Sequence, residues 1–536
     1  MKILLVIPRY NLTNSKRYNY SFPLGLAYIH SAIKRAGYDL DCMNLNHIDG
    51  TISDLINRKL SNTKYDFVCT GHMCIGYHNI KEIITTVHSH ETSPKVILGG
   101  AILTSEPEFM FNLLKPDFGV LGEGEITIVE LLKNLKEKKS LTKVNGLIFK
   151  DLNKKIIITS PRPVIENLDT LPLPDFDEFG LAEQLENSCS NDSDYHNFLD
   201  TPRVYPIICS RSCPFQCTFC YHSLGSKYRV RSIKNVMNEI KGAIKKYDIN
   251  ALLIYDDLFS IDKKRLYDFC DEIKKEFQHT KKPFFWGCQL SVLNVNEEML
   301  AKLKDSGCKV VSYGFESISD DVLKSMKKPI TAEKIDNALK LTLKQGLAIQ
   351  ANFIFGDIAE TKSTAYETLN YWKKNCLGQI SLDFIQPYPG SEIYKHCLRK
   401  GIIKNKLDFL KNINTRYFLN MTEKMTDAEI SILKKDILKA TTNYRAHVIP
   451  KKITHKEGER HAILVKCPFC NTDTIYNNFR ISNRNYFSNL IICRDCNKRF
   501  IVISKLKKII NNFSHLIFPL MSLYLKLKKK IKTSKL

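Results

Sequence analysis

Short apolar runs alternate with helical patterns along most of this chain of 536 residues, and no other feature restricts its fold as strongly. The stretches between the runs, such as Leu24–Ala36 and Ile80–His88, have the periodicity of amphipathic helices. Over residues 1–140 this order predicts a doubly wound, Rossmann-like (flavodoxin-like) α/β domain with a five-stranded sheet. Its expected strands are Lys2–Ile7, Leu40–Leu45, Phe67–Thr70, Lys95–Leu98 and Phe118–Leu121.

Glycines gather where these strands are expected to end. In doubly wound sheets, ligands bind beyond the carboxyl ends of the strands, and glycine lets a bulky ligand approach the backbone closely. The same glycines would also suit ordinary tight turns between strand and helix. The candidate ligand-binding residues at these turns are Gly25, Gly71, Gly99, Gly100, Gly122 and Glu123.

A second series of strand and helix patterns begins near residue 201, after a hairpin and a proline-bearing linker at 141–200. Its six βα units predict a partial (βα)6 TIM-like barrel over residues 201–420, with the chemistry at the C-terminal ends of the strands. The expected strands are Val204–Cys209, Ala251–Tyr255, Phe284–Cys288, Val310–Phe315, Ile349–Phe355 and Ile380–Ile385.

The remaining chain divides by composition. We expect a helical connector at 421–460, a small cysteine-paired module at 461–503 and a basic amphipathic tail at 504–536. The tail contains nine lysines and no acidic residue, in a chain whose net charge is +24. Such a segment suits either contact with an anionic membrane surface or a helix packed on the protein.

Compartment follows from cysteine usage and from the lack of a targeting signal. The N-terminus has no long apolar region followed by a cleavage site, and Ile509–Leu525 is too polar and too short to span a bilayer. Seventeen cysteines without an export signal indicate reduced thiols. We therefore expect a cytoplasmic protein, with peripheral contact at the inner membrane surface as an option for the tail.

Three cysteines follow the first expected barrel strand, with the spacing Cys213-x3-Cys217-x2-Cys220. Three thiolates on a 4Fe-4S cluster leave one iron open to bind another molecule, so the spacing favours a catalytic cluster. Pro214 discourages a regular helix through the loop, which lets the thiolates surround one centre. Cys209 is a conceivable fourth ligand, but its spacing favours an ordinary buried cysteine.

These residues resemble those of the radical S-adenosylmethionine (SAM) enzymes, and specifically of the branch with an N-terminal cobalamin-binding domain. The resemblance covers about residues 1–400. Further matching segments are Tyr228–Ser232, Asp256–Phe259, Tyr313–Ser317, Ile354–Gly356, Glu360–Thr361 and Pro387–Gly390.

The resemblance implies several site residues. SAM would chelate the open iron, with Phe219 beside the adenine and Glu316 on the ribose hydroxyls. A carboxylate at the start of a helix is the plainer interpretation of Glu316. Asp256 and Asp257 would meet the SAM amino group or the substrate, although helix capping explains them equally well.

The resemblance also implies the reaction. One electron from an external flavodoxin- or ferredoxin-type donor would cleave SAM to a 5′-deoxyadenosyl radical. With cobalamin, we expect methylation of an unactivated carbon in an unknown small-molecule or lipid-like substrate. The alternatives are a cobalamin-linked cyclase, oxidase or mutase, a tRNA-modifying radical SAM enzyme, and a nucleic-acid-binding zinc protein. The tRNA alternative lacks a convincing second cysteine set, since Cys42, Cys69 and Cys74 form none.

The cobalamin motif Asp-x-His-x-x-Gly is missing, because no histidine precedes His30 and the segment His47–Gly50 does not match it. Cobalamin would then bind without a histidine on cobalt, or the domain would be vestigial. His72 lies in a suitable loop, but a lone histidine is more often an ordinary polar residue.

A second cysteine set lies near the C-terminus. Two C-x2-C pairs separated by 22 residues have the spacing of a four-cysteine structural zinc site, which would fold a module with little core. A rubredoxin-like iron site uses the same ligands. The predicted ligands are Cys467, Cys470, Cys493 and Cys496.

Overall fold

The computed structural model describes residues 1–10, 13–193, 195–277, 282–413 and 419–512. Its N-terminal domain is built on a sheet of order β2-β1-β3-β4-β5-β6-β7, in which the first five strands pair in parallel. This confirms the predicted doubly wound fold. The parallel strands are β1 (Lys2–Ile7), β2 (Asp39–Asn44), β3 (Phe67–Gly71), β4 (Lys95–Gly99) and β5 (Phe118–Val120).

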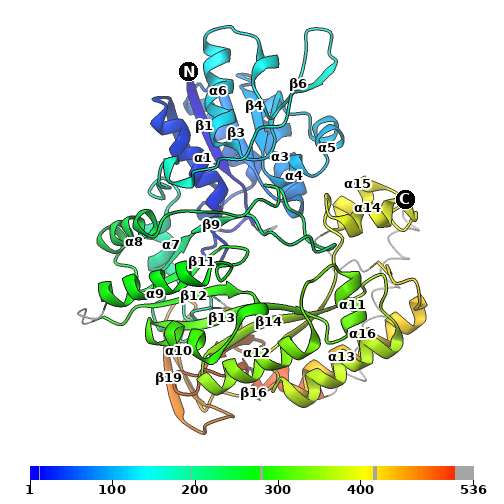
Figure 1. Cartoon of the computed structure of the whole chain (residues 1–536). Helices are drawn as coiled ribbons and strands as arrows, with labels where there is room; N and C mark the ends of the chain where they lie inside the picture. The colour runs from blue at the N-terminus through cyan, green and yellow to red at the C-terminus, as the bar shows by residue number, and fades with distance from the viewer. Residues whose placement is uncertain (11–12, 194, 278–281, 414–418, 513–536) are drawn as a thin grey trace.

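Helices cover both faces of this sheet (Figure 1). Successive residues of β1 belong to different cores, with Ile3 and Leu5 in one and Leu4 and Val6 in the other, as expected of a strand buried on both faces. The helices are α1 (Leu24–Arg35), α2 (Ile52–Asn62), α3 (Tyr77–Ser89), α4 (Ala101–Thr104), α5 (Pro107–Leu114) and α6 (Gly124–Lys136).

The hairpin expected in the 141–200 segment is present, and it extends the N-terminal sheet. Strand β6 (Leu147–Lys150) pairs antiparallel with β5, and β7 (Ile156–Ile158) pairs with β6. The hairpin thereby covers the edge that β5 would otherwise expose. The strands before and after the predicted domain boundary at residue 140 therefore belong to one continuous sheet.

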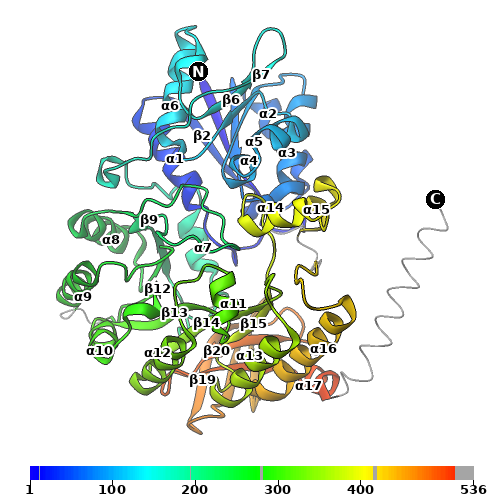
Figure 2. The same cartoon turned by 45° about the vertical axis from the view of Figure 1, so that its right-hand side comes forward.

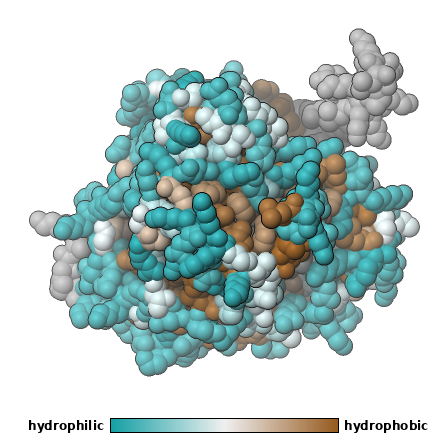
Figure 3. All heavy atoms as spheres, turned by 90° about the horizontal axis from the view of Figure 1, so that it is seen from above, coloured by the Kyte–Doolittle hydropathy of each residue, from teal (hydrophilic) through white to brown (hydrophobic). Residues whose placement is uncertain are grey.

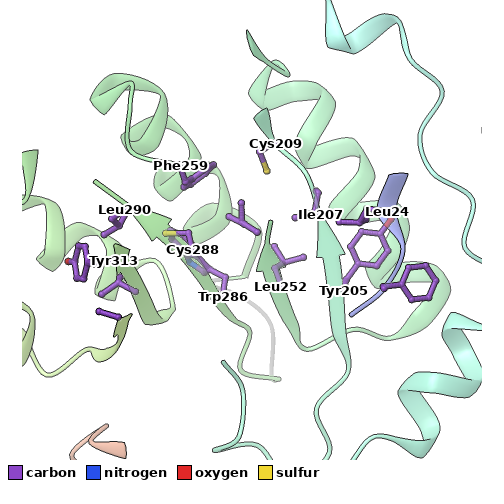
Figure 4. Packing of buried hydrophobic residues seen from close by; sticks show 14 of the residues in the cluster. Leu24, Tyr205, Ile207, Cys209, Leu252, Phe259, Trp286, Cys288, Leu290 and Tyr313 are labelled. Carbon is purple, nitrogen blue, oxygen red and sulfur yellow. The ribbon is translucent and has the colours of Figure 1, made fainter. Parts of the chain in front are cut away.

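The second domain is an open, six-stranded parallel sheet of order β15-β14-β13-β12-β11-β8, as predicted for a partial barrel. Figure 4 shows Tyr205, Leu252 and Trp286 packed together in the buried core of this domain. The strands are β8 (Val204–Ile207), β11 (Ala251–Ile254), β12 (Phe285–Leu290), β13 (Cys308–Glu316), β14 (Ala348–Phe355) and β15 (Ser381–Phe384). The helices are α8 (Ile233–Tyr247), α9 (Lys263–Phe277), α10 (Glu297–Asp305), α11 (Asp320–Ser325), α12 (Ala332–Gln345) and α13 (Lys362–Asn375).

Two helices that follow the barrel lie against the N-terminal domain (Figure 2). These are α14 (Glu392–Arg399) and α15 (Lys406–Asn412). The Tyr394 hydroxyl on α14 donates to Glu106 over 2.7 Å, and Lys406 on α15 forms an ion pair with the same carboxylate. These contacts tie the barrel to the domain that precedes it.

The helical connector predicted at 421–460 is correct only in part. Helix α16 (Asp427–Tyr444) begins with a capping box between Thr426 and Glu429. The prediction is wrong after Tyr444, because β17 (Lys452–Glu457) pairs antiparallel with β18 (Arg460–Lys466) across a turn at Gly458. Most side chains of β17 are polar and exposed. Its sequence therefore lacks the alternation of apolar and polar residues that would indicate a strand.

The C-terminal module therefore starts earlier than residue 461 and contains two three-stranded sheets. It lies against the barrel at the end opposite the N-terminal domain (Figures 1 and 2). The remaining strands are β16 (His447–Val448), β19 (Asp473–Arg480), β20 (Ser488–Ile492) and β21 (Arg499–Ile503).

The outer face seen from above is mostly hydrophilic, and its apolar residues gather toward the middle (Figure 3). Among the described residues, no helix is both long enough and apolar enough to cross a bilayer. The predicted basic tail is described only as far as α17 (Lys505–Asn512), and residues 513–536 lie outside the described residues.

Candidate functional site

The cysteine triplet lies in a loop between two short strands, β9 (Ser210–Arg211) and β10 (Arg229–Val230), which pair with each other. The loop starts at Ser212, whose φ of 68° turns the chain sharply. All three predicted cysteines line one cavity of about 390 Å³. Thiolates gathered on one cavity suit a multi-iron cluster, so the residues fit the predicted cofactor.

Cys209 is placed differently from the triplet. Its side chain is fully buried, it is not among the residues that line this cavity, and burial raises its pKa well above the usual range. The geometry thus favours the interpretation of Cys209 as an ordinary buried cysteine.

The two adjacent aspartates after β11 have different surroundings. Asp256 does not line the cavity, since its carboxylate accepts hydrogen bonds from the backbone N–H of Cys209 and the hydroxyl of Ser210, each over 2.6 Å. Burial raises the pKa of Asp256 to about 6. The structure gives Asp256 an anchoring role at the base of the cysteine loop, in place of the expected cofactor contact. Asp257 does line the cavity.

Glu316 ends β13 and lines the same cavity as the triplet and Phe219. The register shifts between Gly314 and Glu316, and Glu316 has a φ of 61°, so the local backbone turns the carboxylate into the cavity. Lys328 donates to this carboxylate over 2.9 Å. A side chain at Gly314 would collide with both charged groups, which explains the glycine.

Lys328 is a site residue that the sequence did not reveal. Burial lowers its pKa, but the attraction of Glu316 and of the Cys217 and Cys220 sulfurs outweighs burial, so the pKa is raised. Its ammonium group lies 5.9 Å from the ring centre of Phe219. A fixed positive charge here can bind a carboxylate beside the cluster.

The second cavity, of about 420 Å³, lies where the N-terminal strands end. A side chain added at Gly25 or Gly122 would meet only open space, so both glycines leave room for a ligand. This observation fits a large cofactor such as cobalamin. The six predicted residues all line this cavity, namely Gly25, Gly71, Gly99, Gly100, Gly122 and Glu123.

Glu123, however, is bound by arginines. Its carboxylate accepts hydrogen bonds from Arg211 and Arg229 over 2.8–2.9 Å, and Arg211 also donates to Glu125 over 2.5 Å. All four side chains are buried. These ion pairs join the glycine turn of the N-terminal domain to the two strands that flank the cysteine loop. Holding the domains together is therefore a role of Glu123 that the sequence did not reveal.

The two histidines considered as cobalt ligands differ in their placement. The nitrogens of His47 face Tyr20 and Glu183, and His47 is not among the residues that line the second cavity. His72 lines the cavity, where Nδ1 lies 3.2 Å from the Met73 carbonyl and Nε2 is buried without a hydrogen-bond partner, so its geometry leaves that nitrogen available to a ligand.

The two cavities adjoin. Four residues line both of them, and Asp257 is the only acidic residue among the four. A ligand in one cavity would therefore lie next to a ligand in the other. The shared residues are Ser212, Ser223, Leu224 and Asp257.

The four C-terminal cysteines form a separate candidate metal site. Their sulfurs lie within 4.8 Å of one another, with Cys467 and Cys496 3.7 Å apart and Cys470 and Cys493 3.6 Å apart. Tetrahedral zinc thiolates with Zn–S bonds of about 2.3 Å would place sulfurs at nearly this separation. The group can hold a metal ion as it stands.

Both cysteine pairs have the same local geometry. Asn471 and Asn497 follow them in the left-handed conformation, with φ of 64° and 56°. Each asparagine N–H donates to the carbonyl of the first cysteine in its pair over 3.1 Å. The repeated Cys-x-x-Cys-Asn sequence thus specifies the turn as well as the ligands.

Comparison with known proteins agrees with this geometry. The family model of the Radical SAM superfamily matches residues 207–371, and the model of the B12 binding domain matches residues 10–132. Together the matches cover more than half of the chain. The chain belongs to the radical SAM enzymes that carry a B12-binding domain, and its cofactors are accordingly a 4Fe-4S cluster, SAM and cobalamin.

Particular relatives cover most of the chain. An uncharacterized methyltransferase of Pyrococcus horikoshii is 28% identical over 87% of this chain and 96% of the relative. The anaerobic magnesium-protoporphyrin IX monomethyl ester cyclase of Rubrivivax gelatinosus is 26% identical over 74% of this chain and 70% of the relative. The solved structure of the radical SAM methyltransferase TsrM from Kitasatospora setae has a TM-score of 0.59 at 16% identity, over 74% of this chain and 75% of that one, which shows a shared fold.

Proposed function

We propose that this enzyme methylates an unactivated carbon of a small molecule. The observation that carries the proposal is the shared wall of the two cofactor cavities, which brings a radical source and a methyl carrier together at Asp257. When bound, the cluster with SAM supplies a 5′-deoxyadenosyl radical and cobalamin supplies a methyl group.

The protein's own residues position these groups. Cys213, Cys217 and Cys220 would hold the cluster, while Glu316 would accept hydrogen bonds from the ribose hydroxyls of SAM and Lys328 would bind its carboxylate. The Arg211 ion pairs fix the second cavity relative to the cysteine loop. Fixed spacing of this kind places reacting atoms without further reorganisation.

Product analysis tests the proposal. The full-length enzyme, reconstituted without oxygen and given a reductant and substrate, should form 5′-deoxyadenosine and S-adenosylhomocysteine in comparable amounts, because a second SAM remethylates the cobalamin. Formation of deoxyadenosine with substrate consumed, but without S-adenosylhomocysteine, would replace methyl transfer by cyclase, oxidase or mutase chemistry. Among these alternatives the cyclase is the second candidate, because the relative from Rubrivivax gelatinosus is a cyclase.

We also propose that cobalamin binds with no histidine on cobalt, because the Asp-x-His-x-x-Gly motif is missing and His47 is outside the second cavity with its nitrogens facing Tyr20 and Glu183. Electron paramagnetic resonance of the Co(II) form should show no axial nitrogen coupling from a protein imidazole. A clear coupling that disappears on His72→Ala would contradict this. No cobalamin binding at all would indicate a vestigial domain.

We also propose an electron donor, a compartment and a second metal for this enzyme. A flavodoxin- or ferredoxin-type donor would supply the electron, and the cysteines of the described residues, all free, support a reducing, cytoplasmic compartment. Zinc would occupy the C-terminal cysteines. Nucleic acid is not favoured as a partner of that module, because Arg480 and Arg494 form ion pairs with Asp192 and Asp200 of the same chain. Membrane contact would depend on the tail beyond residue 512.

A further inference from the structure

A third cavity, of about 320 Å³, is left over once the cluster, SAM and cobalamin have been assigned to the other two. Three parts of the chain build it: residues 18–22 of the N-terminal domain, α7 (Leu181–Asn187) with the residues after it, and strands β8 and β11 of the barrel. Helix α7 lies between the N-terminal domain and the barrel sheet (Figure 2). The volume is within the usual range for small-molecule sites.

This cavity continues into the cofactor cavities along two neighbouring strands. In a strand, alternate residues face the same side. On β11 and the residues after it, Leu253 lines the third cavity, Tyr255 the third and second, and Asp257 the second and first. On β8 and beyond, Val204 and Pro206 line the third cavity, and the next two alternate residues, Ile208 and Ser210, line the second. The inner face of the barrel thus forms one wall through all three.

The lining is rich in aromatic rings, and the hydroxyl groups of two of its tyrosines are already hydrogen-bonded. The Tyr18 hydroxyl donates to Glu183 over 2.6 Å, and the Tyr20 hydroxyl lies 2.9 Å from a ring nitrogen of His47. Tyr20 also stacks on Tyr10, which lines the second cavity, at a ring separation of 5.4 Å. These side chains therefore offer ring faces to a ligand. The aromatic lining residues are Tyr18, Tyr20, Phe22, Tyr195 and Tyr255.

The charge of the lining excludes an anionic ligand group. Among the lining residues that the structure describes, none is a lysine or an arginine, and the one charged side chain, Asp192, is an acid already paired with Arg480 over 2.8 Å. A ligand carboxylate or phosphate would lose water here without gaining a cation. A hydrogen-bond acceptor is present, because Gln184 lines the cavity and its side-chain oxygen has no hydrogen-bond partner among the described residues.

We propose that the third cavity binds the part of the substrate that does not react, and that this part is a neutral, planar aromatic group carrying a hydrogen-bond donor. The substrate then extends past Tyr255, so that its reacting carbon lies at Asp257, where the two cofactor cavities meet. This inference rests on the proposed function, since it takes the other cavities as cofactor sites.

A matched pair of ring compounds tests the inference on the full-length enzyme loaded with cluster and cobalamin. The probes are 2-naphthol, which is neutral and has one O–H donor, and 2-naphthoate, which has the same rings and a negative charge. We expect saturable binding of 2-naphthol, followed by its fluorescence, with a dissociation constant at least tenfold below that of 2-naphthoate.

Variants locate the binding. Leu253→Trp should fill the cavity and Tyr255→Leu should remove a ring face, and each should weaken 2-naphthol binding at least fivefold. Tyr486→Leu, at an exposed tyrosine of the C-terminal module, should bind as the parent does. If Leu253→Trp does not fold, the affinity of Tyr255→Leu for 2-naphthol decides whether the third cavity is the binding site.

Equal affinity for the two probes, no saturable binding, or binding unchanged in the folded variants would overturn the inference. Cobalamin content and reductive SAM cleavage are measured on the parent enzyme alone. Their loss would count against the proposed function, whereas Leu253 lines the third cavity and neither of the other two, so the Leu253→Trp result assigns probe binding to the third cavity and the two failures are distinguishable.

Discussion

Two adjacent lysines, Lys327 and Lys328, differ in burial and in partner. Lys328 bonds Glu316 inside the cluster cavity, whereas Lys327 bonds Glu392 with both side chains at least half exposed. Lys328→Gln should weaken SAM binding by about tenfold, or roughly 1.4 kcal/mol, because a buried charge-assisted contact is lost. Equilibrium binding of SAM to the reconstituted enzyme measures the effect.

Lys327→Gln is the control, since exposed ion pairs contribute little. It should leave the SAM dissociation constant within about twofold of the parent. Equal losses in the two variants would mean that Lys328 has no specific part in binding SAM.

Glu360 gives a prediction about pH. Its carboxylate is buried and accepts a hydrogen bond from the Gly356 N–H, and burial raises its pKa from an ordinary 4.5 to about 8. A carboxyl group with a raised pKa in the folded state stabilises the protein below pH 4.5, and this stabilisation is lost as pH rises toward 8. Glu360→Gln should therefore unfold at higher urea than the parent at pH 8, with a smaller difference at pH 5. A constant difference between these pH values would rule out the titration.

Residue types and spacing were enough to select cysteines that lie together in the fold, because thiolate sites depend on few residues close in sequence. Lys328 gave no such signal, since its role arises only when the chain brings it to Glu316. Asp256 illustrates a case in which the sequence left two roles open. Its acidic neighbour and its place after a strand suggested a ligand contact, but its carboxylate is used by the backbone of Cys209.

At the scale of elements, the pair β9 and β10 carries the cysteine loop and is held by the N-terminal domain. Removing one partner of a buried ion pair costs about 3–5 kcal/mol, because the other charge is left uncompensated. Arg211→Gln would break the Arg211–Glu125 ion pair, and it should lower the melting temperature clearly and reduce iron and cobalamin content together. Thermal unfolding and metal analysis measure this.

The matched control for Arg211 is Lys227, in the same loop region. Lys227 pairs with Glu166 over 2.7 Å, but both side chains are more than half exposed. Lys227→Gln should change stability by less than about 1 kcal/mol. If Arg211→Gln behaves like this control, the ion pairs do not hold the cysteine loop in place.

Most strands of the two large domains could be predicted, because each is a short, nearly continuous apolar run buried on both faces. Strand β17 could not be predicted, since its side chains are mostly exposed and its extended conformation depends on hydrogen bonds to β18. The pairing of Glu123 with Arg211 also lay beyond prediction, because the partners are 88 residues apart and belong to different domains.

At the scale of the whole molecule, the C-terminal module contacts the barrel at the end away from the cysteine triplet. Asn497 donates to the Gly346 carbonyl just before β14, Gln379 exchanges hydrogen bonds with the Arg499 backbone just before β15, and Asp200 just before β8 pairs with Arg494. Three barrel strands therefore begin at contacts with this module, and the metal site becomes part of the stability of the catalytic domain.

Cys470→Ser should remove the bound metal and lower the melting temperature of the barrel as well as of the module, because a structural metal contributes folding free energy directly. The folded fraction should still bind a 4Fe-4S cluster and cleave SAM, since Cys213, Cys217 and Cys220 line a cavity that includes no residue of the module. Metal analysis, iron absorbance and hydrogen exchange of β8, β14 and β15 measure the three effects. Faster exchange confined to the module, with the three barrel strands unchanged, would mean that the module only rests on the barrel and adds nothing to its stability.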